Sequence, residues 1–218
     1  MKIHHLGEQS SLLSRYVAEL RDVNIQKDSL RFRRNLERIG EIFAYEISKE
    51  MRAMPLTVQT PLGIAETSVP NEKVVIASIM RAALPMHNGI LNYFDRAQNS
   101  FISAYRKYGK DNKFTISFEY ITSPSTEGKT IILCDPMLAT GASMELSYRA
   151  LIERGVPHKA HIVTAIASRD GVEFLKKNLA AHKEVELWVA AVDDELTVKS
   201  YIVPGLGDAG DLAYGDKL

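Results

Sequence analysis

The residues from 135 to 143, DPMLATGAS, set an acidic side chain just ahead of a run of small residues. Four apolar residues, 131–134, precede Asp135 in the pattern of a strand buried on both faces, and a helix is predicted over about 144–154. Small residues let backbone N–H groups close around phosphate oxygens, and a helix N-terminus adds free N–H donors. A carboxylate placed upstream can accept hydrogen bonds from sugar hydroxyls. This stretch favours a site for a phosphorylated sugar; the alternative is an ordinary strand-to-helix turn with Ser143 as N-cap.

A second candidate stretch, 201–214, is dense in glycine and reads YIVPGLGDAGDLAY. Gly205 to Gly210 match the dinucleotide pattern G-x-G-x-x-G in letters, but that fingerprint needs a helix and an acidic ribose ligand roughly 20 residues further on. Only a few residues follow Gly210 here. Because glycine lets main-chain groups approach a ligand without side-chain obstruction, we interpret the stretch as backbone folded around a flat small molecule. A surface turn or an interface tail is the alternative.

Two arginines stand where predicted strands end. Arg81 follows the apolar run 73–79, and Arg106 follows 101–105. Open α/β sheets bind ligands at the carboxyl ends of their strands, so we expect Arg81 to lie at the ligand-binding edge.

The elements that must position these residues alternate between strand and helix from 73 to 192. This alternation predicts an α/β fold with a doubly wound, mainly parallel sheet and right-handed crossovers. We expect a single domain over 1–218, with a core at 71–192 and additions at 1–70 and 193–218. The expected strands are 73–79, 101–105, 114–121, 131–134, 161–167 and 185–192; the expected helices are 85–94, 144–154 and 172–179.

The N-terminal addition is predicted to be helical. Apolar residues at 3.6-residue spacing indicate helices over about 12–20 and 29–51, and the alternation over 57–68 indicates a small hairpin outside the main sheet. Residues 1–10, which include adjacent histidines, are expected to be a solvated or interface segment. Residues 101–121 are expected to form a projecting hairpin that covers a site or reaches a partner subunit.

Composition excludes several classes of protein. The 218 residues carry 27 basic and 27 acidic side chains, so nothing in the overall charge favours nucleic acid or a membrane surface. Cys134 is the single cysteine and is expected to be a packed thiol. No run approaches the ~18 apolar residues of a membrane span, so a cytoplasmic location is predicted.

Together these stretches resemble the uracil phosphoribosyltransferases, members of the type I phosphoribosyltransferase family. The segments 135–143 and 201–211 carry most of the resemblance, which extends to Arg81-Ala-Ala-Leu with Met86 and to Ala104-Tyr105-Arg106. In order and spacing it covers nearly the whole chain. Pro136 stands where most type I relatives have a second acidic residue, as in the uracil enzymes.

The resemblance implies transfer of a phosphoribosyl group from 5-phosphoribosyl 1-diphosphate (PRPP) to N1 of uracil, giving uridine monophosphate and diphosphate in pyrimidine salvage. It implies Mg²⁺ that is carried by PRPP without direct protein ligands, and it allows a purine-nucleotide effector such as GTP. A homodimer or larger homo-oligomer is expected from the hairpin arm and the apolar N-terminal helices, with no nucleic-acid or membrane partner.

The resemblance also assigns residues. It places the catalytic roles on Asp135, Arg106 and Asp208. It implies that PRPP is bound by Arg81, Arg106, Asp135, Pro136, Met137, Leu138, Ala139, Thr140, Gly141, Ala142, Ser143 and Asp208, and uracil by Tyr201, Ile202, Gly207, Asp208 and Ala209.

The sequence departs from the family pattern near these positions. Ala83, Pro85 and Ala142 stand where the family usually has glycine, and Thr197 and Ser200 replace a usual asparagine and glycine. Two alternatives therefore stay open: a phosphoribosyltransferase for another base, and a non-catalytic regulator that senses PRPP or a nucleotide on the same fold.

Overall fold

A twisted sheet forms the centre of the computed structural model, which describes residues 1–108 and 114–216 and, over 104–108 and 114–119, the backbone alone. Within that part of the chain the sheet has eight strands in the order β1-β10-β9-β7-β4-β5-β6, with β8 beside β9. Its strands are β1 (Lys2–His5), β4 (Val74–Met80), β5 (Gln98–Tyr108), β6 (Phe114–Thr122), β7 (Thr130–Cys134), β8 (Met137–Leu138), β9 (Lys159–Ser168) and β10 (Val185–Asp193).

All strand pairs of this sheet are parallel except β5–β6. The register aligns the ends of the central strands, because Cys134 lies beside both Ser78 of β4 and Val163 of β9. The predicted doubly wound, mainly parallel sheet is confirmed. Its carboxyl edge brings the residues after β4 and β7 next to each other.

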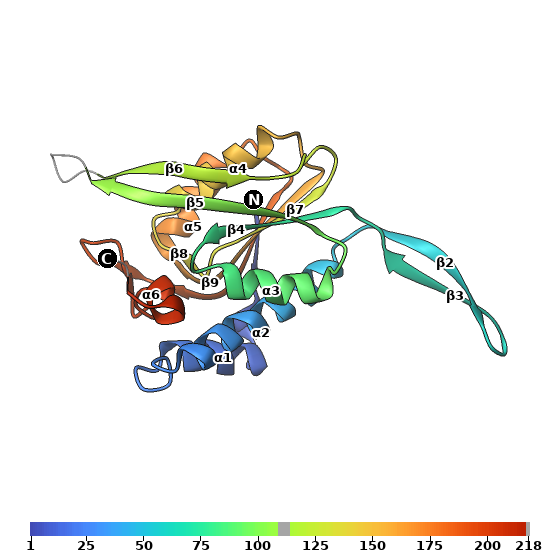
Figure 1. Ribbon diagram of the computed structural model, residues 1–218, viewed down its shortest axis with the longest axis horizontal. Helices are drawn as coiled ribbons and strands as arrows, with labels where there is room; N and C mark the ends of the chain where they lie inside the picture. The colour runs from blue at the N-terminus through green and yellow to red at the C-terminus, as the bar shows by residue number, and fades with distance from the viewer. Residues whose placement is uncertain (109–113, 217–218) are drawn as a thin grey trace.

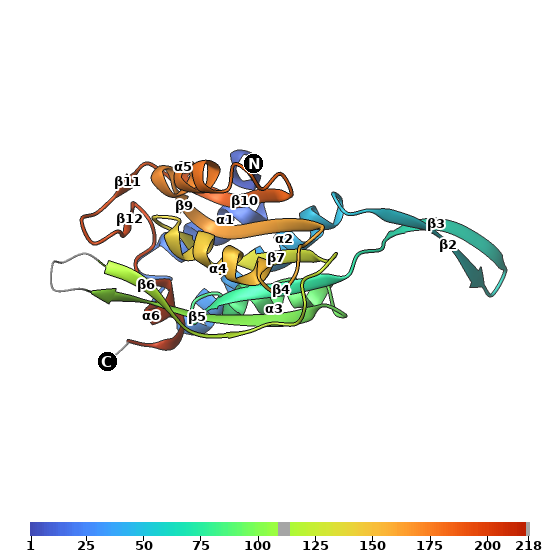
Figure 2. The same cartoon turned by 90° about the horizontal axis from the view of Figure 1, so that it is seen from above.

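Helices cover both faces of the sheet (Figures 1 and 2). The lower face in Figure 1 carries α1 (Leu12–Arg21), α2 (Ser29–Ser48) and α3 (Leu84–Tyr93), and the other face carries α4 (Ala142–Ile152) and α5 (Arg169–Asn178). Two apolar clusters result, one on each face. Side chains alternate along β7 accordingly: Ile132 and Cys134 join the first cluster, and Ile131 and Leu133 join the second.

The long helix α2 follows the pattern that its sequence predicts. Asp28 caps it by accepting a hydrogen bond from the backbone N–H of Arg31 at 3.0 Å. Its apolar stripe is buried, as expected: Phe32, Leu36, Ile39, Phe43 and Ile47.

The contact between α2 and α3 is close because glycines face it from both helices. A Cβ on Gly40 would lie 2.3 Å from the carbonyl oxygen of Met86, and one on Gly89 would lie 1.9 Å from that of Glu37. The two backbones therefore touch directly.

The first residues of the chain form an edge strand of the main sheet, whereas a solvated or interface segment was expected at 1–10. Strand β1 pairs in parallel with β10, followed by a 3₁₀ turn, η1 (Leu6–Glu8). His4 stacks on Trp188 with ring centroids 3.6 Å apart, and its Nε2 lies 2.9 Å from a carboxylate oxygen of Glu186. The polar segment β1 forms a strand here because His4 contacts the ring of Trp188 and the carboxylate of Glu186 on the neighbouring strand β10.

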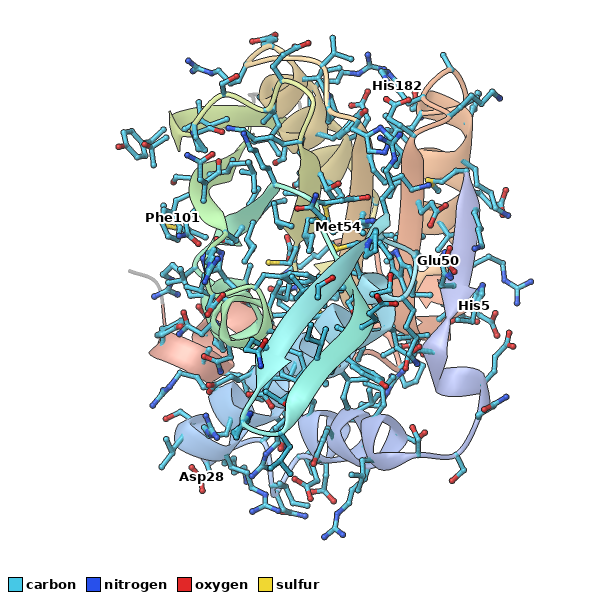
Figure 3. The ribbon with its side chains drawn as sticks, turned by 90° about the vertical axis from the view of Figure 1, so that its right-hand side faces the viewer. His5, Asp28, Glu50, Met54, Phe101 and His182 are labelled. Carbon is cyan, nitrogen blue, oxygen red and sulfur yellow. The ribbon has the colours of Figure 1, made fainter. Side chains whose placement is uncertain are left out.

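An arm of two strands, β2 (Ala53–Thr60) and β3 (Gly63–Pro70), projects from the body of the protein (Figures 1 and 2). Figure 3 views the molecule from the side of this arm, with Met54 on the arm and Glu50 just before it. The expected hairpin at 57–68 is confirmed and is longer than predicted. The expected hairpin at 101–121 is confirmed as the antiparallel pair β5–β6, but this pair extends the main sheet and is not a separate arm; its turn at 109–113 lies outside the described residues.

The C-terminal segment crosses the carboxyl edge of the sheet. It forms a small two-stranded sheet, β11 (Glu195–Leu196) with β12 (Ile202–Val203), and then α6 (Ala209–Tyr214), which packs near α2. Helix α6 was not expected from the sequence. Among the described residues, no helix is both long and apolar enough to cross a membrane.

Candidate active site

A cleft of about 600 Å³ opens at the carboxyl edge of the sheet. Three segments that are distant in sequence line it: the end of β4, the stretch from Asp135 into the start of α4, and the C-terminal segment. The lining residues are Ile79, Met80, Arg81, Ala82, Asp135, Met137, Leu138, Ala139, Thr140, Gly141, Ser143, Met144, Ser200, Tyr201, Ile202, Gly207, Asp208, Ala209, Gly210 and Asp211.

Asp135 occupies the first position after β7. Its backbone N–H donates to the carbonyl oxygen of Val163 at 3.1 Å, so the sheet hydrogen bonding continues up to this residue. Its Oδ1 accepts the N–H of Met137 at 3.2 Å, which turns the chain towards the short strand β8. The carboxylate is thereby oriented at the floor of the cleft.

The loop from Ala139 to Gly141 leads into α4 through a left-handed residue. Gly141 is the N-cap of α4 and has φ of +83°. A Cβ there would lie 2.8 Å from Cδ1 of Phe174 and 3.0 Å from the carbonyl oxygen of Gly171. The N-cap is therefore a glycine, not Ser143, which lies inside the first turn. The first N–H groups of a helix have no intrahelical partner, so this end of α4 offers donors to an anion.

Helix α5 supports the same loop from behind. Oγ of Ser168 donates to the carbonyl oxygen of Ala139 at 2.5 Å and accepts the N–H of Gly171 at 2.9 Å. A Cβ on Gly171 would lie 2.3 Å from the carbonyl oxygen of Ala139. The loop after β7 is thus fixed by backbone contacts on the side facing away from the cleft.

Arg81 directly follows β4, across a cis peptide bond from Met80. Its Nη2 donates to Oδ1 of Asp211 at 3.0 Å and to the carbonyl oxygen of Gly215 at 3.1 Å. Both partners belong to the C-terminal segment. The guanidinium therefore joins the sheet edge to α6.

The carboxylate of Asp208 caps α6. Its Oδ1 accepts the N–H groups of Gly210 at 2.9 Å and of Asp211 at 3.0 Å. The glycines and the cap together bring the backbone of 207–210 to the cleft wall.

The turn before β12 contains the one non-glycine residue of the described chain with positive φ, Ser200 at +61°. Its N–H donates to the carbonyl oxygen of Thr197 at 2.7 Å, and Oγ1 of Thr197 accepts the N–H of Tyr201 at 3.0 Å. This left-handed position is one that glycine adopts without strain. The Tyr201 side chain is 44% exposed beside the cleft, whereas Ile202 is buried.

Most of the predicted site residues meet in this one cleft. Arg81, Asp135, Asp208, the loop 137–141 with Ser143, and the predicted base-binding residues Tyr201, Ile202, Gly207 and Ala209 all line it. Pro136 and Ala142 belong to the same loop but do not line the cleft. The backbone of Arg106 lies in β5, and its side chain is outside the described residues.

The departures from the family pattern after Arg81 do not crowd the cleft. Ala83 and Pro85 are buried, and Ala83 packs in the apolar cluster that includes α2 and α3. Ala82 is the residue of this turn that faces the cleft.

Asp211 is the residue whose place the sequence did not reveal. It lies within the 201–211 motif, but its pairing with Arg81 spans 130 positions. The only sequence signal for this pairing was that Arg81 and Asp211 carry opposite charges and lie in two segments predicted to meet at the cleft.

The acid–base groups of the site are few. Of the described residues that line the cleft, none is a histidine or cysteine, and no cluster of three or more His, Cys, Asp or Glu side chains able to hold a metal occurs in the described chain. Burial raises the pKa of the Cys134 thiol far above its usual range, so this neighbour of Asp135 is a packed thiol. The described lining combines an arginine, carboxylates and backbone N–H groups, which are groups suited to anions and hydroxyl groups, and it includes no cysteine.

A parallel sheet with an acidic residue, a loop of small residues and an arginine at its carboxyl edge is the arrangement of the type I phosphoribosyltransferase fold. A structure titled as a hypoxanthine phosphoribosyltransferase from Staphylococcus aureus shares this fold, with a TM-score of 0.50 at 12% identity, covering 87% of this chain and 84% of that one. The AQ2163 protein from Aquifex aeolicus is more similar, with a TM-score of 0.85 at 30% identity over 98% of both chains.

The family follows from the sequence comparisons. A family profile described as Uracil phosphoribosyltransferase matches residues 8–216. Proteins named uracil phosphoribosyltransferase are 56% identical in Porphyromonas gingivalis, over all of both chains, and 37% identical in Pyrococcus furiosus, over 96% of this chain and 88% of that protein. The chain belongs to the uracil phosphoribosyltransferase family.

Proposed function

We propose that this protein transfers the phosphoribosyl group of PRPP to N1 of uracil, giving uridine monophosphate and diphosphate. The observation that carries the proposal is the single cleft in which Arg81, Asp135, the loop before α4 and the C-terminal glycine segment meet. Each of these segments matches one part of the two substrates: diphosphate, ribose, 5′-phosphate and base.

The 5′-phosphate is assigned to the loop Thr140–Ser143. The left-handed Gly141 lets the chain turn so that consecutive N–H groups point the same way, and the start of α4 adds its partial positive charge. The support of this loop by Ser168 and Gly171 means that little reorganisation is needed when the phosphate binds.

The ribose hydroxyls are assigned to Asp135, and the diphosphate to Arg81 and Arg106. Mg²⁺ enters with PRPP as part of the substrate, and it neutralises charge on the diphosphate. The carboxylates of Asp135 and Asp208 lie at the same cleft, so its negative charge fits a substrate that carries the cation without requiring a direct protein ligand.

Uracil is assigned to the segment from Tyr201 to Ala209. The backbone of Gly207 has φ of +95°, and a Cβ there would come no nearer than 3.9 Å to another residue, the side chain of Leu212. Open space beside a glycine suits a planar ring that is read through main-chain N–H and C=O groups.

In the reaction, the bond from C1 of ribose to the diphosphate breaks and a bond from C1 to N1 of uracil forms. The N1 proton ends on the released diphosphate. Positive charge develops on the ribose ring, where the Asp135 carboxylate stabilises it, and negative charge develops on the leaving group, where the guanidinium groups do so. Positioning by the rigid loop supplies the remainder of the rate enhancement.

The experiment is an assay of purified protein with PRPP, Mg²⁺ and a panel of bases. Uridine monophosphate from uracil, with other bases at least tenfold poorer, supports the proposal. Preference for another base supports the alternative of a phosphoribosyltransferase with a different acceptor, which the unusual turn at Ser200 motivates. Folded protein that binds PRPP without turning over any base supports the regulator.

The proposal extends to self-association through the arm. Cross-strand neighbours share a face of a hairpin, so Met54, Leu56 and Val58 lie on one face together with Val69, Thr67 and Ala65. Each of the first three is 39% exposed. A two-stranded hairpin is marginally stable alone, and an exposed apolar face indicates a partner. A second copy of this chain is the partner that we assign.

A further inference from the structure

Arg21, the last residue of α1, and Asp193, the last residue of β10, form a fork-to-fork ion pair. Both nitrogen–oxygen distances, from Nη1 to Oδ2 and from Nη2 to Oδ1, are 2.8 Å. The Asp193 side chain is 7% exposed and that of Arg21 is 23% exposed. Two parallel hydrogen bonds of this kind constrain geometry as well as adding energy.

The pair holds both polar groups of one residue, Gly205. Nη1 of Arg21 donates to the Gly205 carbonyl oxygen at 3.0 Å, and Oδ2 of Asp193 accepts the Gly205 N–H at 2.9 Å. Gly205 has φ of +53°, and a Cβ on it would lie 2.1 Å from the carbonyl oxygen of Ile202. The chain is therefore folded tightly back on itself at the point that the ion pair holds.

Gly205 sits between two residues of the cleft wall but does not line the cleft itself. Ile202 precedes it by three positions and Gly207 follows it by two, and both line the cleft. Gln26, just beyond α1, adds a further contact, because its Nε2 lies 3.3 Å from the carbonyl oxygen of Leu206. The N-terminal region thus contacts the base-binding segment through Arg21 and Gln26, which do not line the cleft.

A purely structural ion pair is the alternative. Removing two charges from water costs about as much as their attraction returns, so a buried pair is weak evidence for stability by itself. Here the pair is also hydrogen-bonded to a loop backbone of unusual conformation. That combination points to control of loop geometry.

We propose that Arg21 and Asp193 are positioning residues for the acceptor base. They act through Gly205 on Ile202 and Gly207 and touch neither substrate. The inference rests on the proposed function, because it takes 201–209 as the uracil-binding segment. Its consequence is that helix α1, far from the phosphate loop in sequence, sets the affinity for uracil without setting that for PRPP.

The test compares Arg21→Met, Arg21→Lys and Asp193→Asn with the matched control Arg15→Met, on the same helix but contacting Glu19. We expect Arg21→Met to raise the KM for uracil at least tenfold while the KM for PRPP stays within about twofold. Arg21→Lys should recover part of the loss, since lysine can pair with the carboxylate but lacks the planar fork. Arg15→Met should leave both constants unchanged.

Equal changes in both KM values, or wild-type kinetics in Arg21→Met, would overturn the inference. If Arg21→Met does not fold, Asp193→Asn provides the same comparison, because asparagine keeps an acceptor for the Gly205 N–H. Wild-type protein that turns over no uracil would instead refute the proposed function. In that case amide hydrogen exchange decides the inference: exchange of 201–210 must accelerate in Arg21→Met while that of β9 stays constant, and unchanged exchange overturns it.

Discussion

The guanidinium of Arg81 donates a hydrogen bond of 3.0 Å to the carboxylate of Asp211. Its Nη2 also reaches the carbonyl oxygen of Gly215. A guanidinium has five N–H donors, so Nε and Nη1 still offer three to a phosphate while Nη2 is held. The pairing with Asp211 therefore orients the Arg81 side chain and leaves three of its N–H donors for a phosphate.

Asp211→Asn is therefore expected to weaken PRPP binding modestly. The partners are 38% and 31% exposed, and such pairs contribute about 0.2–1 kcal/mol, which corresponds to a rise in the KM for PRPP of up to about fivefold. Asp216→Asn, on the same segment and exposed, is the control. A larger rise for uracil than for PRPP would contradict this role.

Asp135→Asn is expected to lower kcat by about two to three orders of magnitude. Asparagine keeps an oxygen for the N–H of Met137 but removes the charge that the proposed function assigns to the ribose, and one electrostatic contact to a transition state is typically worth about 3–4 kcal/mol. Steady-state rates check this against Asp95→Asn, an exposed acid outside the cleft lining. Unchanged kcat would remove Asp135 from the mechanism.

Gly141→Ala is expected to lose both stability and PRPP affinity. The alanine would be strained at φ of +83° and its methyl would meet Phe174 and Gly171. Gly128→Ala isolates the first effect, because Gly128 has φ of +65° but nothing within 4 Å of a Cβ. We expect a loss of about 1–2 kcal/mol for Gly128→Ala and a larger one for Gly141→Ala in urea unfolding. Equal losses of stability in the two variants would mean that Phe174 and Gly171 can move away from the added methyl at little cost.

Stability is expected to fall as the pH drops below about 6.5. His161 is buried and its Nδ1 accepts the Trp188 N–H at 3.0 Å, and burial lowers its pKa to about 4. The unfolded chain therefore takes up a proton between pH 6.5 and 4 that the folded protein does not, which lowers the free energy of unfolding by up to about 3 kcal/mol at pH 4. Burial also lowers the pKa of His87, with the same sign.

His161→Gln should flatten this pH dependence, since glutamine keeps an acceptor for Trp188 and does not titrate. His158→Gln, at an exposed histidine, is the control substitution. Glu19, whose pKa is lowered to about 2 chiefly by hydrogen bonds from Arg31 and Asn35, loses its contribution only below about pH 4.5. Urea titrations between pH 7 and 5 separate the two groups, and an unaltered slope in His161→Gln would refute the assignment.

Leu56→Lys combined with Val58→Lys should abolish self-association. Charges on the apolar face of the arm oppose its burial, whereas Thr57→Lys, on the opposite face, should be tolerated. Light scattering should give a mass near 24.3 kDa for the double variant and a multiple of it for the parent. A parent that is monomeric at all concentrations would refute the assignment of a second copy.

Apolar patterns were enough to predict the helices and strands of the core. The stripe on α2 is buried because apolar residues recur about every 3.6 positions, and β4, β7, β9 and β10 are buried on both faces because their apolar residues form continuous runs. The cleft could be anticipated for the same reason, since strand ends mark the ligand edge.

The remaining features depend on partners that are distant in sequence. Strand β1 reads KIHH and is stabilised by Trp188 and Glu186 on β10, far along the chain. Helix α6 has six residues, too few for a periodic pattern, and depends on the Asp208 cap and on Arg33, which binds the carbonyl oxygen of Ala213 at 2.7 Å. Pairings of this kind have no local pattern from which to predict them.

The single cysteine gives the protein an internal reporter of local opening. Cys134 is fully buried and ends the strand that carries Asp135, and its raised pKa keeps it in the unreactive thiol form. A thiol reagent can modify it only when the centre of the sheet separates, so the rate of alkylation measures how often the floor of the cleft opens. Slower alkylation in the presence of PRPP would register substrate binding without any assay of turnover.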